Sequence, residues 1–145
     1  MARIEESVDI KRPAEKVFTY TTDATNWPQW QTILPQAEQT SQGVIGVGTI
    51  FKGIVHMMGL NFRWTATATE CQPPARFGKI ITSSPMMVEQ HNTYNPLEGG
   101  IRFTIVYDLK IIGIFKLMSP ILVSRMRTEL RKSLGNLKGI LEAQS

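Results

Sequence analysis

The sequence has little of the side chains that build disulfides and metal centres. Its 145 residues include one cysteine, Cys71, and two histidines, His56 and His91. One cysteine excludes an intrachain disulfide, and so few thiol and imidazole groups exclude a thiolate-rich zinc site. We therefore expect no metal ion and no cofactor.

Long apolar runs and a biased composition are missing as well. Acidic side chains interrupt residues 1–10, where a signal peptide needs an apolar stretch, so we expect a cytoplasmic protein. The most apolar segment, residues 111–123, contains Lys116 and Pro120 and is too short to span a bilayer. With 42% hydrophobic and 19% charged residues, the chain is predicted to fold as a single domain over residues 1–145.

Positive charge is concentrated near the C-terminus. Residues 110–145 contain seven basic and two acidic side chains, whereas residues 1–109 contain nine basic and ten acidic ones. Such an excess fits a solvated helix face, a nucleic-acid binder or a protein that contacts an anionic membrane. We expect no specific nucleic-acid partner, because the solvated arginine face of this segment has no aromatic side chains for base stacking.

The first thirty residues alternate between strand and helix patterns. Residues 3–11 predict a strand, and residues 13–21 predict a helix that begins at a proline. Asp23 is a candidate cap for a second short helix. That helix carries Trp27 and Trp30, whose spacing of three lets both indoles point inward.

Between about residues 35 and 110 the hydrophobic period changes to two, which predicts consecutive strands. Turns are expected at Gly59, at residues 73–74, at residues 83–85 and at residues 95–100. Because these connections are short, neighbouring strands must pair antiparallel.

The end of the chain predicts one long helix from about residue 113 to residue 143. Apolar side chains recur there at steps of three and four: Phe115, Met118, Leu122, Met126, Leu130, Leu134, Leu137 and Leu141. We expect the helix to bend at Pro120, which lacks a backbone N–H.

This order of elements predicts an α+β fold. A curved antiparallel sheet of about seven strands would wrap around the long C-terminal helix, with two short helices after the first strand. Ala66 and Ala68 would then face the slender side chains of Met118 and Met126. Small residues opposite flexible ones favour a cavity, and an interdigitated core is the alternative.

Several motifs resemble a known family. Residues 8–30, VDIKRPAEKVFTYTTDATNWPQW, resemble the opening of polyketide cyclase/dehydrase-like proteins of the START/birch-allergen-like (SRPBCC) superfamily. Residues 47–51, 69–76 and 134–138 fit the same family, whereas residues 100–102 read Gly-Ile-Arg where it commonly has Gly-Thr-Arg. The resemblance implies a helix-grip fold with a deep apolar cavity. Family members bind lipids, sterols, quinones, polyketides or plant hormones, and only some are enzymes.

The residues predicted to contact a ligand share the inward parity of their strands or the apolar face of a helix. They are Trp30, Phe51, Val55, Trp64, Ala66, Gln90, Asn92, Tyr94, Phe103, Ile105, Tyr107, Met118, Leu122 and Met126. We predict no catalytic residue, because strand parity directs the obvious titratable side chains to solvent: His56, Glu89, His91 and Asp108.

The sequence thus predicts binding or transport of a hydrophobic small molecule, such as a lipid, a quinone or a polyketide-like compound. The alternative is a cyclase or dehydratase that uses the same cavity. Residues 111–123, with the pairs at 57–58 and 86–87, would form a flexible apolar gate that contacts membranes transiently. Core filling or a homodimer contact are the other interpretations of the methionine pairs.

Overall fold

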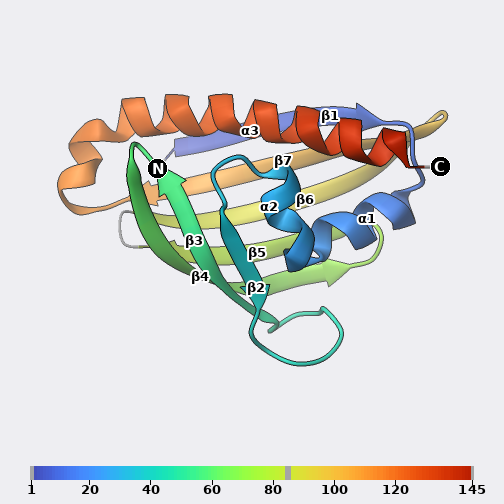
Figure 1. Ribbon diagram of the computed structural model, residues 1–145, viewed down its shortest axis with the longest axis horizontal. Coiled ribbons are helices and arrows are strands. Elements are labelled where there is room, and N and C mark those ends of the chain that lie inside the picture. Colours follow the sequence, from blue (N-terminus) through green and yellow to red (C-terminus); the bar gives the residue numbers. More distant parts are fainter. Residues whose placement is uncertain (1, 84–85, 145) are drawn as a thin grey trace.

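The computed structural model describes residues 2–83 and 86–144. A seven-stranded sheet and a long helix make up most of the chain (Figure 1). In chain order the elements are β1 (Ala2–Ile10), α1 (Ala14–Thr22), η1 (Ala24–Asn26), α2 (Trp27–Trp30), β2 (Gln36–Gln39), β3 (Ile50–Met57), β4 (Leu60–Gln72), β5 (Arg76–Ser83), β6 (Met86–Leu97), β7 (Gly100–Ile111), η2 (Gly113–Met118) and α3 (Ser119–Ala143).

The sheet is antiparallel throughout, in the order β1-β7-β6-β5-β4-β3-β2. Consecutive strands from β2 to β7 are neighbours, and β1 pairs with β7. The connections from β3 to β7 are short, which requires antiparallel pairing, whereas residues 40–49 form a longer loop between β2 and β3. Figure 1 shows α3 lying along one face of the curved sheet, with α1 near the end of the sheet where the C-terminus lies. The predicted α+β helix-grip fold is confirmed.

The strand, the first helix and the inward indoles expected in the first thirty residues are confirmed, whereas Asp23 caps the short 3₁₀ helix η1 and not α2, which carries the two tryptophans. Val17, Phe18 and Thr21 of α1 are buried. The Asp23 carboxylate accepts a hydrogen bond from the backbone N–H of Thr25 at 3.0 Å and caps η1. The indoles of the following α2 both point into the core.

The turn predicted at residues 95–100 is shorter than expected. β6 continues through Pro96 to Leu97, so only two residues connect it to β7. The backbone N–H of Tyr94 donates toward the β5 side, to Ala75 O at 3.0 Å, and residue 96 faces the same side. β5 begins at Arg76, which pairs with Thr93, so β5 does not extend along β6 as far as Pro96. No strand on that side therefore needs a backbone N–H from residue 96, which a proline cannot supply. The turn predicted at residues 83–85 falls partly outside the described residues.

The C-terminal helix begins later than predicted. Residues 113–118 form the 3₁₀ helix η2, none of whose side chains is fully buried, and Phe115 and Met118 are half-buried. Pro120 does not bend a long helix but stands in the first turn of α3, where an N–H has no intrahelical acceptor. From Leu122 onward the predicted apolar face is buried.

Ion pairs and hydrogen bonds hold α3 against β1. The Arg131 guanidinium donates to the Glu6 carboxylate at 2.7 Å, and Lys138 Nζ donates to the backbone oxygen of Asp9 at 2.6 Å. Arg131 and Lys138 therefore act within the molecule, which accounts for part of the positive charge near the C-terminus.

Candidate functional site

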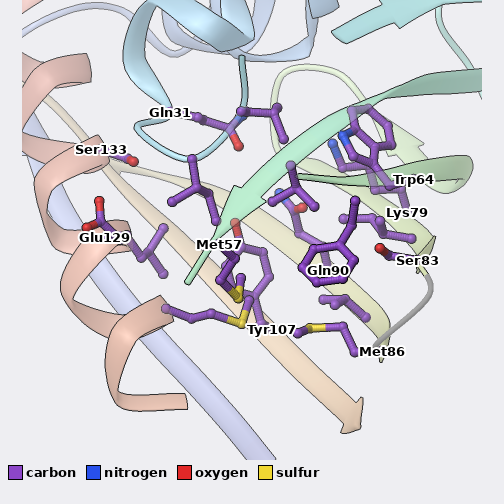
Figure 2. A pocket seen from close by; sticks show the side chains of 18 residues that line it. Gln31, Met57, Trp64, Lys79, Ser83, Met86, Gln90, Tyr107, Glu129 and Ser133 are labelled. Atoms are coloured by element: carbon purple, nitrogen blue, oxygen red, sulfur yellow. The ribbon is translucent and has the colours of Figure 1, made fainter. Parts of the chain in front are cut away.

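A cavity of about 90 Å³ lies between the sheet and the first half of α3. Five strands, α3 and the segment after α2 contribute to its wall (Figure 2). The lining residues are Gln31, Ile33, Leu34, Val55, Met57, Phe62, Trp64, Lys79, Ile81, Ser83, Met86, Val88, Gln90, Tyr107, Met126, Glu129, Leu130 and Ser133.

Strand alternation explains why this wall is mostly apolar. Met57, Trp64 and Val88 occupy inward positions on β3, β4 and β6. The residues next to them along each strand face solvent. Met57 and Met86 enter from the sheet, and Met126 enters from α3. Because methionine is unbranched and flexible, these three side chains can adjust to the shape of an occupant.

The structure divides the predicted ligand contacts into two groups. Val55, Trp64, Gln90, Tyr107 and Met126 line the cavity. The remaining predicted contacts lie outside its lining: Trp30, Phe51, Ala66, Asn92, Tyr94, Phe103, Ile105, Met118 and Leu122. All of this second group except Met118 are buried in the core. Their role as ligand contacts stays a prediction.

Aromatic packing fills the interior beside the cavity. The Tyr94 ring centre lies 4.9 Å from that of Phe103 and 5.1 Å from that of Phe18. The Tyr94 hydroxyl shares a hydrogen bond of 2.7 Å with Thr21 Oγ1. Burial raises the pKa of Tyr94 far above its ordinary value. Tyr94 is therefore satisfied within the core without a ligand.

Lys79 of β5 is a cavity residue that the sequence analysis missed. Its side chain is inward and only 4% exposed, and Nζ lies 3.5 Å from the ring centre of Trp27. Burial in these apolar surroundings lowers the pKa of Lys79 to about 7, because desolvation penalises the ammonium form. The sequence analysis named only titratable side chains that face solvent and did not consider Lys79, whose side chain lies at the cavity wall.

The signal for Lys79 was present in strand parity. Lys79 alternates in phase with Phe77 and Ile81, both of which are apolar, so the strand pattern placed it inward. The other titratable side chains on the strands behave as predicted. His56 bonds Asn61, and His91 pairs with Glu89, each at the solvent-facing surface.

Three more polar groups face the cavity beside Lys79. The Trp64 indole is 4% exposed, and its buried Nε1–H has no hydrogen-bond partner in the described part of the chain. Burial raises the pKa of Tyr107 to about 12, so its hydroxyl stays protonated. Gln90 Nε2 donates to Asn92 Oδ1 at 2.9 Å. This part of the wall is rich in hydrogen-bond donors.

The α3 side of the cavity has the opposite charge. The Glu129 carboxylate accepts a hydrogen bond from Thr32 Oγ1 at 2.5 Å, and this bond holds the pKa of Glu129 below its ordinary value. Ser133 Oγ accepts from the backbone N–H of Thr32 at 3.0 Å. In Figure 2, Glu129 and Ser133 lie on the opposite side of the cavity from Trp64 and Lys79.

The positions of the metal-ligating side chains and the composition of the helices bear on metal binding and on membrane crossing. Within residues 2–83 and 86–144, no three side chains of His, Cys, Asp or Glu gather closely enough to hold a metal ion. None of the helices formed by these residues has both the length and the apolar character needed to cross a membrane.

Almost the whole chain matches a known protein family. The model of the family described as polyketide cyclase / dehydrase and lipid transport matches residues 1–142. No curated protein matches the sequence. The family match confirms the resemblance that the motifs of residues 8–30 indicated.

Solved structures share the fold at low sequence identity. The protein TTHA0849 from Thermus thermophilus is 19% identical with a TM-score of 0.83, covering 99% of this chain and 100% of its own. A START superfamily protein from Mycobacterium smegmatis is 15% identical with a TM-score of 0.80, covering 99% of both chains. The ZhuI aromatase/cyclase from a Streptomyces species is 14% identical with a TM-score of 0.80, covering 97% of this chain and 93% of its own.

Proposed function

The chain belongs to the family of polyketide cyclases, dehydrases and lipid-transport proteins, and on that premise we propose that it binds and carries a hydrophobic small molecule. The observation that supports this most directly is the apolar cavity between the sheet and α3. An apolar wall with a few polar groups is typical of sites for lipids, quinones and polyketide-like compounds. The polar groups would orient the ligand, and the burial of its apolar part would supply most of the affinity.

The size of the cavity limits what it holds without adjustment. Its volume of about 90 Å³ is smaller than the roughly 150 Å³ cavity that accommodates benzene in a packed protein core. A longer ligand must therefore displace side chains, and the three methionines of the wall are the ones most able to move. We expect the cavity to widen when a ligand enters.

A substitution that fills the cavity tests this proposal. Val55→Phe places a larger side chain in the wall, so we expect the affinity for 1-octanol to fall at least tenfold. Ile50→Phe adds the same kind of bulk on the solvent face of the same strand and should leave binding unchanged. Isothermal titration measures both, and native mass spectrometry of the purified wild type would identify a co-purified ligand. Equal binding by wild type and Val55→Phe would contradict the proposal.

An enzyme of the cyclase or dehydratase type is the second candidate. The observation in its favour is the amine of Lys79 in the cavity, since a lysine with a lowered pKa can exchange protons near pH 7. Incubation with a polyketide-like substrate separates the two functions. A dehydratase releases a product lighter by one water, whereas a carrier returns its ligand unchanged.

Transient membrane contact would deliver a ligand to this cavity. At one end of the molecule, η2 and the start of α3 expose Ile114 by 80%, Leu117 by 90% and Ile121 by 60%. Phe115 of η2 packs against Phe62 of the cavity wall, with ring centres 6.0 Å apart. Exposed apolar side chains next to a site, together with basic residues, suit an anionic bilayer.

Vesicle sedimentation measures this contact. We expect binding to vesicles that contain phosphatidylserine, weaker binding to phosphatidylcholine alone, and a loss of at least threefold in Leu117→Ser. Ile80→Ser removes an exposed apolar side chain from the sheet and serves as the control. If the protein does not bind vesicles and forms a dimer in analytical ultracentrifugation, the exposed apolar residues serve self-association and the membrane contact is ruled out.

A further inference from the structure

Lys79 is a buried cation without a counter-charge. In the part of the chain that the structure describes, no carboxylate lies within 4.0 Å of its Nζ, and no hydrogen bond to an oxygen holds it. Its nearest neighbours are the faces of Trp27 and Phe51, whose ring centres lie 3.5 and 5.7 Å from Nζ. Aromatic faces compensate an ammonium only partly, and a buried charge normally requires an ionic partner.

Other hydrogen-bond donors line the same cavity as Lys79. Trp64 Nε1–H is buried and unpartnered among the described residues, and the Tyr107 hydroxyl faces the same cavity. An ammonium, an indole N–H and a phenol can all donate, so the group that suits them accepts several hydrogen bonds and carries negative charge. A carboxylate does both, because its two oxygens offer about four acceptor sites.

Resting on the proposed function, we infer that the ligand is an amphiphile whose carboxylate pairs with Lys79 and accepts a hydrogen bond from Trp64. Its apolar tail lies along Met57, Met86 and Met126. A single lysine matches the single charge of a carboxylate. Glu129 repels the head from the α3 side, so the two charged ends of the cavity orient the ligand.

Octanoate and 1-octanol are matched probes for this inference, because they share a tail and differ in the charge of the head. At pH 6 we expect octanoate to bind at least tenfold more tightly than 1-octanol in isothermal titration. The affinity for octanoate should then fall about a hundredfold between pH 6 and pH 9, as Lys79 with a pKa of about 7 loses its proton. The affinity for 1-octanol should not change over this range.

The other titratable groups that line the cavity do not change charge in this window. Burial raises the pKa of Tyr107 to about 12, and the pKa of Glu129 is lowered by its bond to Thr32. The residues that flank Lys79 on β4 and β6 are Ala68 and Gln90, and those beneath it on α2 and β3 are Trp27 and Phe51. None of these four ionises.

A pair of lysine variants completes the test. Lys79→Met should lose at least tenfold in octanoate affinity at pH 6 and all of the pH dependence, while it still binds 1-octanol. Lys110→Met removes the same charge from an exposed position of β7 and should behave as wild type. The wild-type pH profile tests the inference independently of whether the variants fold.

The outcomes separate this inference from the proposed function. If 1-octanol binds and octanoate shows neither tighter binding nor pH dependence, the carboxylate inference is wrong and the cavity remains a binding site. If neither probe binds, both the inference and the proposed function are overturned. Octanoate binding that Lys79→Met leaves unchanged would place the head elsewhere and also overturn the inference.

Discussion

The two ends of the space between the sheet and α3 are filled in different ways. Near α1, the rings of Phe18, Phe77, Tyr94 and Phe103 pack against one another with centres 4.9 to 6.4 Å apart. Toward η2, the lining includes three methionines and two valines, and a cavity of about 90 Å³ remains. Rigid aromatic rings close one end, while flexible side chains leave the other end able to take a ligand.

Polar groups differ between the two ends in the same way. At the aromatic end, the Tyr94 hydroxyl bonds Thr21 inside the protein. At the cavity end, Lys79 and Trp64 Nε1 lack partners within the described residues. Trp30 Nε1, beside Phe103, lacks a hydrogen-bond partner in the described part of the chain as well. The feature that distinguishes the cavity end is therefore the buried amine of Lys79, which has aromatic neighbours and no ionic partner among the described residues, and this supports a role in binding.

Truncating a side chain at each end should show the largest contrast. Phe103 is fully buried among aromatic rings, so Phe103→Ala should lower the free energy of unfolding by about 3–5 kcal/mol. Met126 already borders a void, so Met126→Ala should cost only about 2 kcal/mol. Urea unfolding measures both. Equal losses would mean that the cavity end is as tightly packed in solution as the aromatic end.

Lys79 belongs to the cavity end, and its protonation should make the free energy of unfolding depend on pH above pH 7. Its pKa is about 7 in the folded protein and near its ordinary value of 10.5 when unfolded, so above pH 7 the unfolded chain binds more protons. Stability contributed by Lys79 therefore rises with pH, by about 3 kcal/mol at most between pH 7 and pH 9.5.

The difference between wild type and Lys79→Met isolates this effect. Both proteins carry the other groups that titrate in the window, so only the Lys79 contribution separates their unfolding curves. We expect the variant to be the more stable protein at pH 7 and the gap to narrow as the pH rises. A constant gap would show that Lys79 keeps an ordinary pKa.

Removing one hydroxyl at each end should give the smallest effect. Tyr94→Phe breaks the hydrogen bond with Thr21 Oγ1 and should cost about 1 kcal/mol. Tyr107→Phe removes a hydroxyl for which the described residues offer no hydrogen bond, so stability should change by less than about 0.5 kcal/mol. Thermal unfolding compares the two. A larger loss at Tyr107 would reveal a structural role for its hydroxyl.

Much of the fold could be predicted because it follows from local patterns. The alternation of β6 and β7 correctly directed Gln90, Asn92 and Phe103 inward. Pro120 shows the limit of such reasoning, because proline fits the first turn of a helix as well as a bend. Glu6 interrupts the apolar parity of β1 for a reason that lies 125 residues away, in its ion pair with Arg131.

The site was harder to predict than the fold. Of the fourteen predicted contacts, five line the cavity, and the cavity residues Lys79 and Glu129 were not among the predictions. Strand parity predicts on which face of the sheet a side chain lies. It does not predict whether another side chain already fills the space opposite. The inward position of Lys79 could have been predicted from the parity of its strand. The position of Glu129 could not, because it depends on how closely α3 approaches the loop at Thr32.

The sequence by itself determined most of the secondary structure, the inward face of the strands and the family, because hydrophobic periods of 2 and 3.6 and short motifs are local properties. Only the tertiary structure decided where the interior is filled and where it stays hollow. That outcome depends on the distance between α3 and each part of the sheet, which residues far apart in the chain set together.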